Sequence, residues 1–280
     1  MGEILDKQYK LRKSHERSLL EEVAKRLDTA IELREQGNKD ESNMIMEDMK
    51  GWLQTISKEL EQQLPDKDVV TSNHLTFPIN GEFIASGDKV VLAVIKHDEK
   101  DKYLALSYEY SFAKDMFQNE KFREKLWEEF ISESAFVCSI YEKNTEEYVG
   151  YCSIKNITKE EWELAIELVP NNCRKGYGTE ALNLFINAVH KLTGRRFFRV
   201  RVEIDNHASQ RLMKKLGAYP NGISEFLLHG EEIDRFQAEH KNMITDDIRK
   251  VAADFCMEAE DILGYVLEYR FDMQKMSIII

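Results

Sequence analysis

Apolar residues recur at helical spacing over the first 64 positions of the chain. They form two runs, Leu20, Val23, Leu27 and Ile31, then Ile45, Met49, Leu53, Ile56 and Leu60. The polar stretch from Gly37 to Ser42 lies between the runs and has the composition of a helix end followed by a helix start. The pattern predicts an antiparallel helical hairpin over residues 1–66. Its apolar stripes fit packing within the chain, against a second copy or against another protein, and the contact surface would lie in residues 1–64.

After Leu64-Pro65-Asp66-Lys67-Asp68 the apolar positions alternate with polar ones, so residues 67–280 are expected to form a separate mixed α/β domain. Asn80-Gly81 predicts a hairpin between His74–Ile79 and Glu82–Ala85. The other predicted strands cover residues 89–96, 136–141, 148–154, 162–169, 197–204 and 265–271. Helices are predicted over residues 103–110, 120–131, 182–192, 209–216 and 244–262, the last as a helical insertion near 240–262.

Composition narrows the class of protein. The chain has 280 residues, of which 42% are hydrophobic and 32% charged, as in soluble globular proteins. The net charge of −12 argues against nucleic-acid binding, which needs a basic surface. The four cysteines form no CxxC pair, which favours free thiols over a disulfide framework or a zinc site. No apolar run reaches membrane-spanning length, and we expect a cytoplasmic protein with no membrane contact and no metal.

The most informative stretch is the basic, glycine-bearing segment from Cys173 to Ala181 between a predicted strand and a predicted helix. Amide groups of a first helical turn lack intrahelical partners, and the helix dipole adds positive potential there. Gly176 and Gly178 allow the backbone to approach a ligand closely. The segment therefore predicts a site for a phosphate-bearing cofactor.

Three kinds of phosphate ligand compete for this segment. A P-loop is excluded because Lys175 precedes Gly176 instead of following the second glycine. A dinucleotide fold fits the GxGxxA spacing from Gly176 to Ala181, with Glu203 as the ribose-binding acid, but the polar sextet 170–175 separates the glycines from the strand. The third interpretation is a pyrophosphate held by the loop amides beside Arg174 and Lys175.

A second feature follows the next strand. Asn206 precedes a short helix that contains Ser209 and ends near Gly217, and its side chain suits either a helix cap or a ligand contact. Together with Gly176, Gly178 and the continuation Thr179-Glu180-Ala181-Leu182, these residues resemble the GNAT family of N-acetyltransferases. The NxxS…KLG pattern is similar to that of the branch that acetylates ribosomal-protein N-termini, including alanine.

The resemblance implies a mixed, mostly antiparallel central sheet flanked by helices, with acetyl-CoA as co-substrate and a primary amine of unknown identity as acceptor. It implies that the backbone of Leu168 and Val169 holds the pantetheine arm. It places the pyrophosphate on the amides of Arg174, Lys175, Gly176, Tyr177, Gly178 and Thr179, with Asn206 and Ser209 near the thioester. It also places residues 112–118 on the acceptor side. Two positions depart from the family pattern: Cys173 stands where Arg or Gln is usual, and Met213 where a proton-donating tyrosine is common.

Acetyl transfer to an amine needs a base, and the strand before the loop offers two carboxylates. Period-two alternation puts Glu163 and Glu167 on one face of that strand, and Arg199 and Arg201 on one face of the next. Each glutamate is thus either the base or a member of an ion-pair ladder, and Ser209 is the third catalytic candidate. Two other functions stay open, a CoA-binding regulatory or scaffolding module and a nicotinamide-dependent oxidoreductase.

Overall fold

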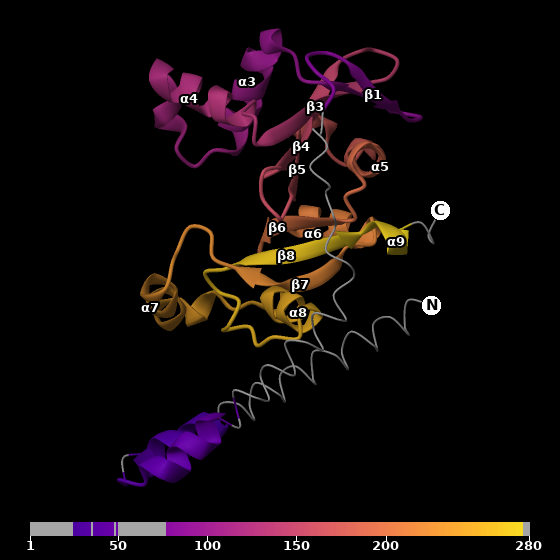
Figure 1. Ribbon diagram of the computed structural model, residues 1–280. Coiled ribbons are helices and arrows are strands. Elements are labelled where there is room, and N and C mark those ends of the chain that lie inside the picture. The colour runs from indigo at the N-terminus through magenta and orange to yellow at the C-terminus, as the bar shows by residue number, and fades with distance from the viewer. Residues whose placement is uncertain (1–24, 35, 48, 50–76, 277–280) are drawn as a thin grey trace. The chain divides into compact units, whose positions relative to one another are not determined.

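The computed structural model describes residues 25–34, 36–47, 49 and 77–276 (Figure 1). The chain divides into two compact units, residues 1–69 and 70–280. None of the described helices is long and apolar enough to cross a bilayer.

The first unit contains a helical hairpin in its described part, as the sequence predicts. Residues 25–34 and 39–47 are helical, and Gly37, with φ of 85°, makes the turn between them. The Ser42 hydroxyl donates a hydrogen bond of 2.7 Å to the Ala30 carbonyl, which joins the two helices. Leu27 and Ile31 of the predicted stripe are exposed, while Leu20, Val23, Leu53, Ile56 and Leu60 lie outside the described residues.

The described residues of the second unit build an eight-stranded sheet in the order β1-β2-β3-β4-β5-β6-β8-β7 (Figure 1). The strands are β1 Phe83–Ser86, β2 Val90–Val94, β3 Ala135–Glu142, β4 Tyr148–Lys155, β5 Glu163–Leu168, β6 Phe197–Glu203, β7 Tyr219–Ser224 and β8 Val266–Asp272. Neighbouring strands run antiparallel except β5 and β6, which are parallel. The predicted mostly antiparallel sheet is therefore confirmed, and the dinucleotide fold, which needs a parallel sheet, is wrong.

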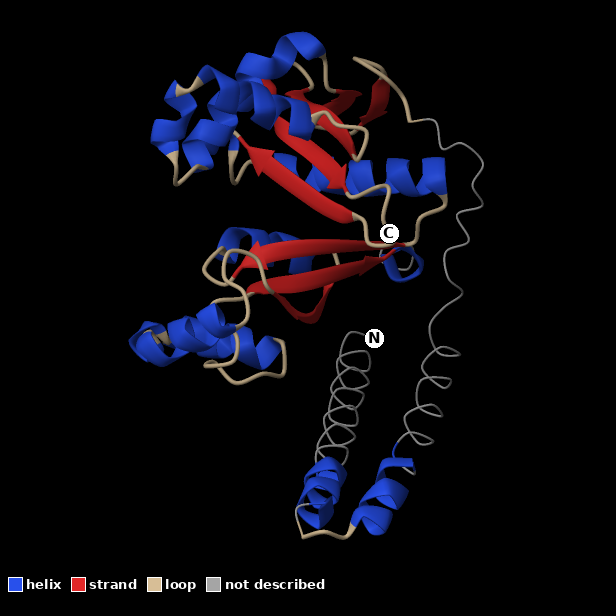
Figure 2. Cartoon of the chain, turned by 60° about the vertical axis from the view of Figure 1, so that its left-hand side comes forward, coloured by secondary structure: helices blue, strands red, loops and turns tan. Residues whose placement is uncertain are grey.

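The parallel pair is short. Its register consists of Glu163 opposite Arg199, whereas β5 pairs with β4, and β6 with β8, along their lengths. Beyond that point the two halves of the sheet diverge, as Figure 2 shows. The carboxyl half of β5 therefore has no partner strand among the described residues on the side away from β4, and we call that side the free edge of β5.

Helices cover both faces of the first half of the sheet. The α-helices are α3 Lys100–Tyr110, α4 Glu120–Phe130, α5 Tyr177–Thr193, α6 His207–Lys215, α7 Glu231–Glu239, α8 Asp246–Asp254 and α9 Met273–Met276. Short 3-10 turns are η1 His97–Glu99, η2 Lys114–Gln118, η3 Pro170–Asn172 and η4 Lys241–Met243. Alternate residues of β3 and β4 pack against α5 on one face and against α3 and α4 on the other, which gives two buried clusters.

Two predictions about the strands and helices were wrong. Residues 77–79 are not a strand, and β1 pairs instead with β2 across a turn at Gly87, although Asn80 and Gly81 do form a turn. The helix predicted over residues 244–262 is confirmed only as α8, because Cys256 adopts a left-handed φ of 56°, which ends helical geometry. Strand β7 and helix α7 were missed, since Pro220-Asn221-Gly222 has the composition of a loop but forms a strand with a bulge.

A buried carboxylate ties the start of α3 to the sheet. Glu99 is 2% exposed, and its carboxyl oxygens accept hydrogen bonds from the Lys96 amide at 2.9 Å, the Ser139 hydroxyl at 2.9 Å and the Tyr141 hydroxyl. The Lys102 ammonium lies 3.3 Å away. Burial raises the pKa of Glu99, but these hydrogen bonds outweigh it and the net shift is downward from 4.5. The ionised form is therefore the one that stabilises the fold.

Glu99→Gln should lower the free energy of unfolding at neutral pH by about 2 kcal/mol, because the glutamine side chain would bring an amide group against donors that require an acceptor. Urea denaturation at pH 7 measures this change. Since the folded pKa is depressed, the stability contributed by Glu99 is complete above its unfolded pKa and is lost as pH falls through the folded value. The difference between the two proteins should shrink at acidic pH.

The matched control is Glu124→Gln, which removes an exposed partner of Lys100 in the same region. Its cost should stay under about 0.5 kcal/mol. Equal effects of the two substitutions would mean that the buried carboxylate is not what anchors α3.

Candidate active site

The glycine segment forms a loop at the carboxyl end of β5 and the beginning of the 17-residue helix α5. Two of its residues adopt left-handed backbone conformations, Arg174 with φ of 63° and Gly176 with φ of 89°. A Cβ added at Gly178 would lie 3.1 Å from Leu168 Cδ1, so the missing side chain lets the helix begin close to the strand. The structure thus forms the predicted strand, loop and helix, with the first-turn amides of α5 at the loop.

The loop side chains supply positive charge. Arg174 and Lys175 are exposed, and the Lys175 ammonium donates to Asn172 Oδ1 at 2.9 Å and lies 6.0 Å from the Tyr177 ring centroid. Cys173 is also exposed, and its thiol lies 3.9 Å from the Val169 carbonyl oxygen. Arg174 and Lys175 are thus accessible to an anion at the predicted position.

Sequence reasoning missed a third cation at the loop. Lys89, in the turn just before β2, donates from its ammonium to the Lys175 carbonyl at 3.0 Å. The Glu180 carboxylate, in the first turn of α5, accepts the Lys89 amide at 2.8 Å. No local pattern signals this contact, because the two lysines lie 86 positions apart.

The predicted pantetheine contacts are partly engaged within the chain. The Val169 amide donates to the Val149 carbonyl at 2.8 Å, and the Val169 carbonyl accepts from the Asn172 amide at 2.8 Å. The Leu168 carbonyl accepts from the Tyr110 hydroxyl at 2.8 Å. A ligand that lies along this strand would therefore contact the free edge of β5 between Glu163 and Leu168. At the Leu168 carbonyl it would have to share the oxygen with the Tyr110 hydroxyl.

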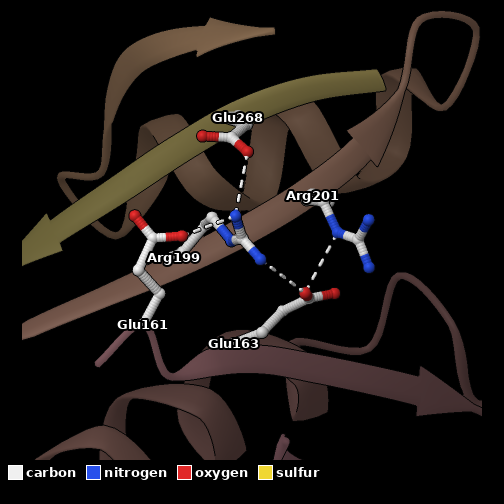
Figure 3. A network of polar contacts seen from close by, with 5 residues as sticks. All are labelled: Glu161, Glu163, Arg199, Arg201 and Glu268. Carbon is white, nitrogen blue, oxygen red and sulfur yellow. Dashed lines mark hydrogen bonds and ion pairs between the residues drawn. The ribbon is translucent and has the colours of Figure 1, made fainter. Parts of the chain in front are cut away.

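Glu163 belongs to an ion-pair network where β5 and β6 part (Figure 3). Its Oε2 atom lies 3.0 Å from Arg201 Nε and 3.4 Å from Arg199 Nη2. Arg199 Nη1 also pairs with Glu161 at 2.7 Å and Glu268 at 3.2 Å. Two arginines hold this carboxylate, so of the two roles predicted for Glu163 the geometry favours the ion-pair ladder.

Glu167 lies on the same face of β5 but in a different environment. Burial raises its pKa above 4.5, and the Tyr151 hydroxyl and the Lys155 charge offset that rise only in part. Its Oε2 atom is buried and has no hydrogen-bond partner among the described residues. A desolvated carboxylate with a free oxygen and a raised pKa has the properties of a general base.

Tyrosines surround Glu167 from α3 and β4. The pKa of Tyr110 is raised to about 12 by burial, by Cys173 and by the Glu167 charge. The pKa of Tyr103 is raised to about 12 by burial and, more weakly, by Glu167. The pKa of Tyr151 is also raised, mainly by burial. These phenols stay protonated at neutral pH, so they supply donors and apolar surface around the carboxylate but no second base.

The downstream helix matches its predicted start. Asn206 caps α6, since its Oδ1 accepts the Ser209 amide at 3.0 Å. Met213, where a tyrosine is common in the resembling family, is 1% exposed and packs in the core. The structure thus gives Asn206 a capping role, and the Ser209 side chain lies in the first turn of α6.

No group of three or more His, Cys, Asp and Glu side chains suited to hold a metal occurs in the described residues. The second unit combines the glycine loop, the free edge of β5 and the desolvated carboxylate of Glu167. These belong together because loop, edge and carboxylate all lie on β5 and its continuation.

Comparisons with known proteins identify the family of this domain. Residues 86–219 match the model of the acetyltransferase (GNAT) domain. No curated protein matches the chain. A RimL ribosomal L7/L12 alpha-N-protein acetyltransferase solved with coenzyme A is 12% identical, with 69% of this chain and 98% of that chain covered and a TM-score of 0.48. The spermidine/spermine N-acetyltransferase SpeG from Vibrio cholerae is 10% identical, with 68% and 96% covered and a TM-score of 0.46.

The matched residues run from the last residue of β1 to the first of β7 and include every candidate residue of the loop, of β5 and of α6. The chain thus carries an acetyltransferase domain of the GNAT family, which supports an acyltransferase activity.

Proposed function

We propose that the protein is an acetyl-CoA-dependent N-acetyltransferase whose acceptor is a primary amine, either a protein N-terminus or a small amine. The observation that carries the proposal is Glu167, a desolvated carboxylate on the strand that leads into the phosphate loop of a GNAT domain.

The residues present fit the cofactor. Gly176 and Gly178 let the loop pack closely against Lys89 and Leu168, and Arg174 and Lys175 are exposed in the same loop. The amides from Arg174 to Thr179 would hold the diphosphate at the positive end of α5. The free edge of β5 supplies unpaired backbone groups for the pantetheine arm. Acetyl-CoA, when bound, supplies the activated acetyl group.

The chain must then deprotonate the acceptor. An alkyl amine has a pKa of about 10 and a protein α-amino group one of about 8, so both are mostly protonated at neutral pH and a neighbouring base is required. Glu167 fits because burial raises its pKa, which makes its ionised form a stronger base than an exposed carboxylate. Its Oε2 atom is free to accept the proton, directly or through a water molecule.

Other polar residues have supporting roles in this proposal. Glu163, fixed by Arg199 and Arg201, holds β6 against the start of β5. The Ser209 hydroxyl at the start of α6 would hydrogen-bond the reacting group, a positioning role that suits a hydroxyl better than acid catalysis. Residues 112–118 form a largely exposed segment after α3 on the predicted acceptor side, with Phe112 92% exposed.

The second candidate is a CoA-binding regulatory module with little turnover. The intramolecular hydrogen bonds at Leu168 and Val169, which occupy groups predicted to hold the cofactor, favour it. Calorimetry with acetyl-CoA and a panel of primary amines with thiol release as readout separate the two. Binding with turnover supports the N-acetyltransferase, and binding without turnover supports the regulatory module. Absence of binding at millimolar acetyl-CoA would contradict both proposals.

Glu167→Gln should lower kcat by about 100-fold while the KM for acetyl-CoA stays unchanged, because the base is lost and the loop is not touched. Steady-state kinetics with the best acceptor of the panel measure both constants. In the wild-type enzyme kcat should rise with pH through the raised pKa of Glu167, and the variant should lose that rise. Glu163→Gln is the matched control, and a loss of kcat in it as large as in Glu167→Gln would contradict the assignment.

Stability should change in the opposite order. Glu163→Gln should cost about 2 kcal/mol in urea denaturation at pH 7, because two arginines lose a charged acceptor. Glu167→Gln should be neutral or stabilising at that pH. In the wild type the pKa of Glu167 is higher in the folded state than in the unfolded state, so the free energy of unfolding falls as pH rises from 4.5 through the folded pKa. A glutamine at this position does not ionise and therefore avoids that loss of stability.

At a pH near 4.5, the ordinary pKa of a glutamate, the wild type and Glu167→Gln should therefore have nearly equal stability. Equal destabilisation of both variants at neutral pH would instead place Glu167 in a structural ion pair.

A further inference from the structure

The turn between β1 and β2 is docked on the first helical turn of α5. Glu180 Oε1 accepts the Lys89 amide at 2.8 Å and the Val90 amide at 3.3 Å. A Cβ added at Gly87 would lie 1.9 Å from the same oxygen, so the turn approaches this closely because it has a glycine there. The carboxylate therefore fixes the backbone of Lys89 beside the phosphate loop.

The Lys89 ammonium lies against the loop backbone. It donates to the Lys175 carbonyl at 3.0 Å, and a Cβ added at Gly176 would lie 3.0 Å from it. An ammonium has three protons to donate, and none of the ion pairs among the described residues includes Lys89. Two donors are therefore left for another acceptor.

The surroundings of this ammonium favour an anion. Arg174 and Lys175 follow one another in the same loop, and the helix dipole places the positive end of α5 there. The Glu180 carboxylate lies close by, but its Oε1 is already engaged by two backbone amides. Like charges gathered at one loop repel each other until an anion compensates them.

We propose that Lys89 is a binding residue for the diphosphate of coenzyme A, supplied by the β1–β2 turn to a loop 86 positions away. The inference rests on the proposed function for its ligand. We choose the diphosphate because the ammonium bonds the Lys175 carbonyl and lies on the side of Gly176 where a side chain would stand, and the amides of these two residues belong to the segment expected to hold that group. The loop and the turn together form the site.

The test is calorimetric titration of the full chain with CoA and with 3′-dephospho-CoA, which retains the diphosphate. Lys89→Met should weaken both ligands about fivefold, because a charge-assisted contact to the shared diphosphate is lost. Lys89→Arg should restore most of the affinity. The matched control is Lys143→Met, which removes an ammonium that donates to the Gly87 carbonyl of the same turn at 2.6 Å and should leave both affinities unchanged.

Three results would overturn the inference while the proposed function stands: wild-type affinity in Lys89→Met, an equal loss in Lys143→Met, or weakening of CoA alone, which would place the ammonium on the 3′-phosphate. If Lys89→Met has a lower melting temperature than the wild type, Lys89→Gln takes its place in the titration. The glutamine amide removes the charge but keeps a hydrogen-bond donor for the Lys175 carbonyl. Failure of the wild type to bind either ligand would overturn the proposed function itself.

Discussion

The parting of β5 from β6 is the constraint on which the rest of the site depends. Parallel strands cannot be joined by a tight turn, so the chain crosses from β5 to β6 through α5, and the crossover begins with the glycine loop. Because the strands pair at Glu163 and Arg199 and then diverge, the carboxyl half of β5 keeps an unpaired edge next to that loop.

Ion pairs hold β5 and β6 together at the position where the two strands part. Arg199 and Arg201 lie on one face of β6, and the carboxylates that hold them come from the start of β5, from the segment just before it and from β8. The network joins β5, β6 and β8 next to the single paired position of β5 and β6, Glu163 opposite Arg199 (Figure 3). The arginine side chains are about one quarter exposed, so water screens part of their attraction to the carboxylates. The network therefore contributes more to the relative positions of the strands than to the free energy of unfolding.

Local patterns predicted the strands and helices near the site well, since alternation and helical spacing are local properties. They predicted β3, β4, β5, β6, α5 and α6, the glycine loop and the alternation of Glu163 with Glu167. The local patterns failed to predict features that depend on contacts between residues far apart in the sequence. The turn at Gly87 is set by Glu180, and Lys89 reaches Lys175 across the sheet. Asn80-Gly81 turns the chain as its composition predicts, but the partner that β1 pairs with is β2.

The two glutamates of β5 show why the base could not be assigned from the sequence. Both lie on the same face of the strand, four positions apart, and the alternation treats them alike. Glu163 lies where β6 is still paired, so arginines from that strand neutralise it. Glu167 lies beyond the parting, where β6 no longer follows and tyrosines of α3 and β4 surround it. The divergence that leaves the carboxyl half of β5 without a partner strand therefore also keeps the arginines of β6 away from Glu167, and this carboxylate keeps a raised pKa and an oxygen with no hydrogen-bond partner among the described residues.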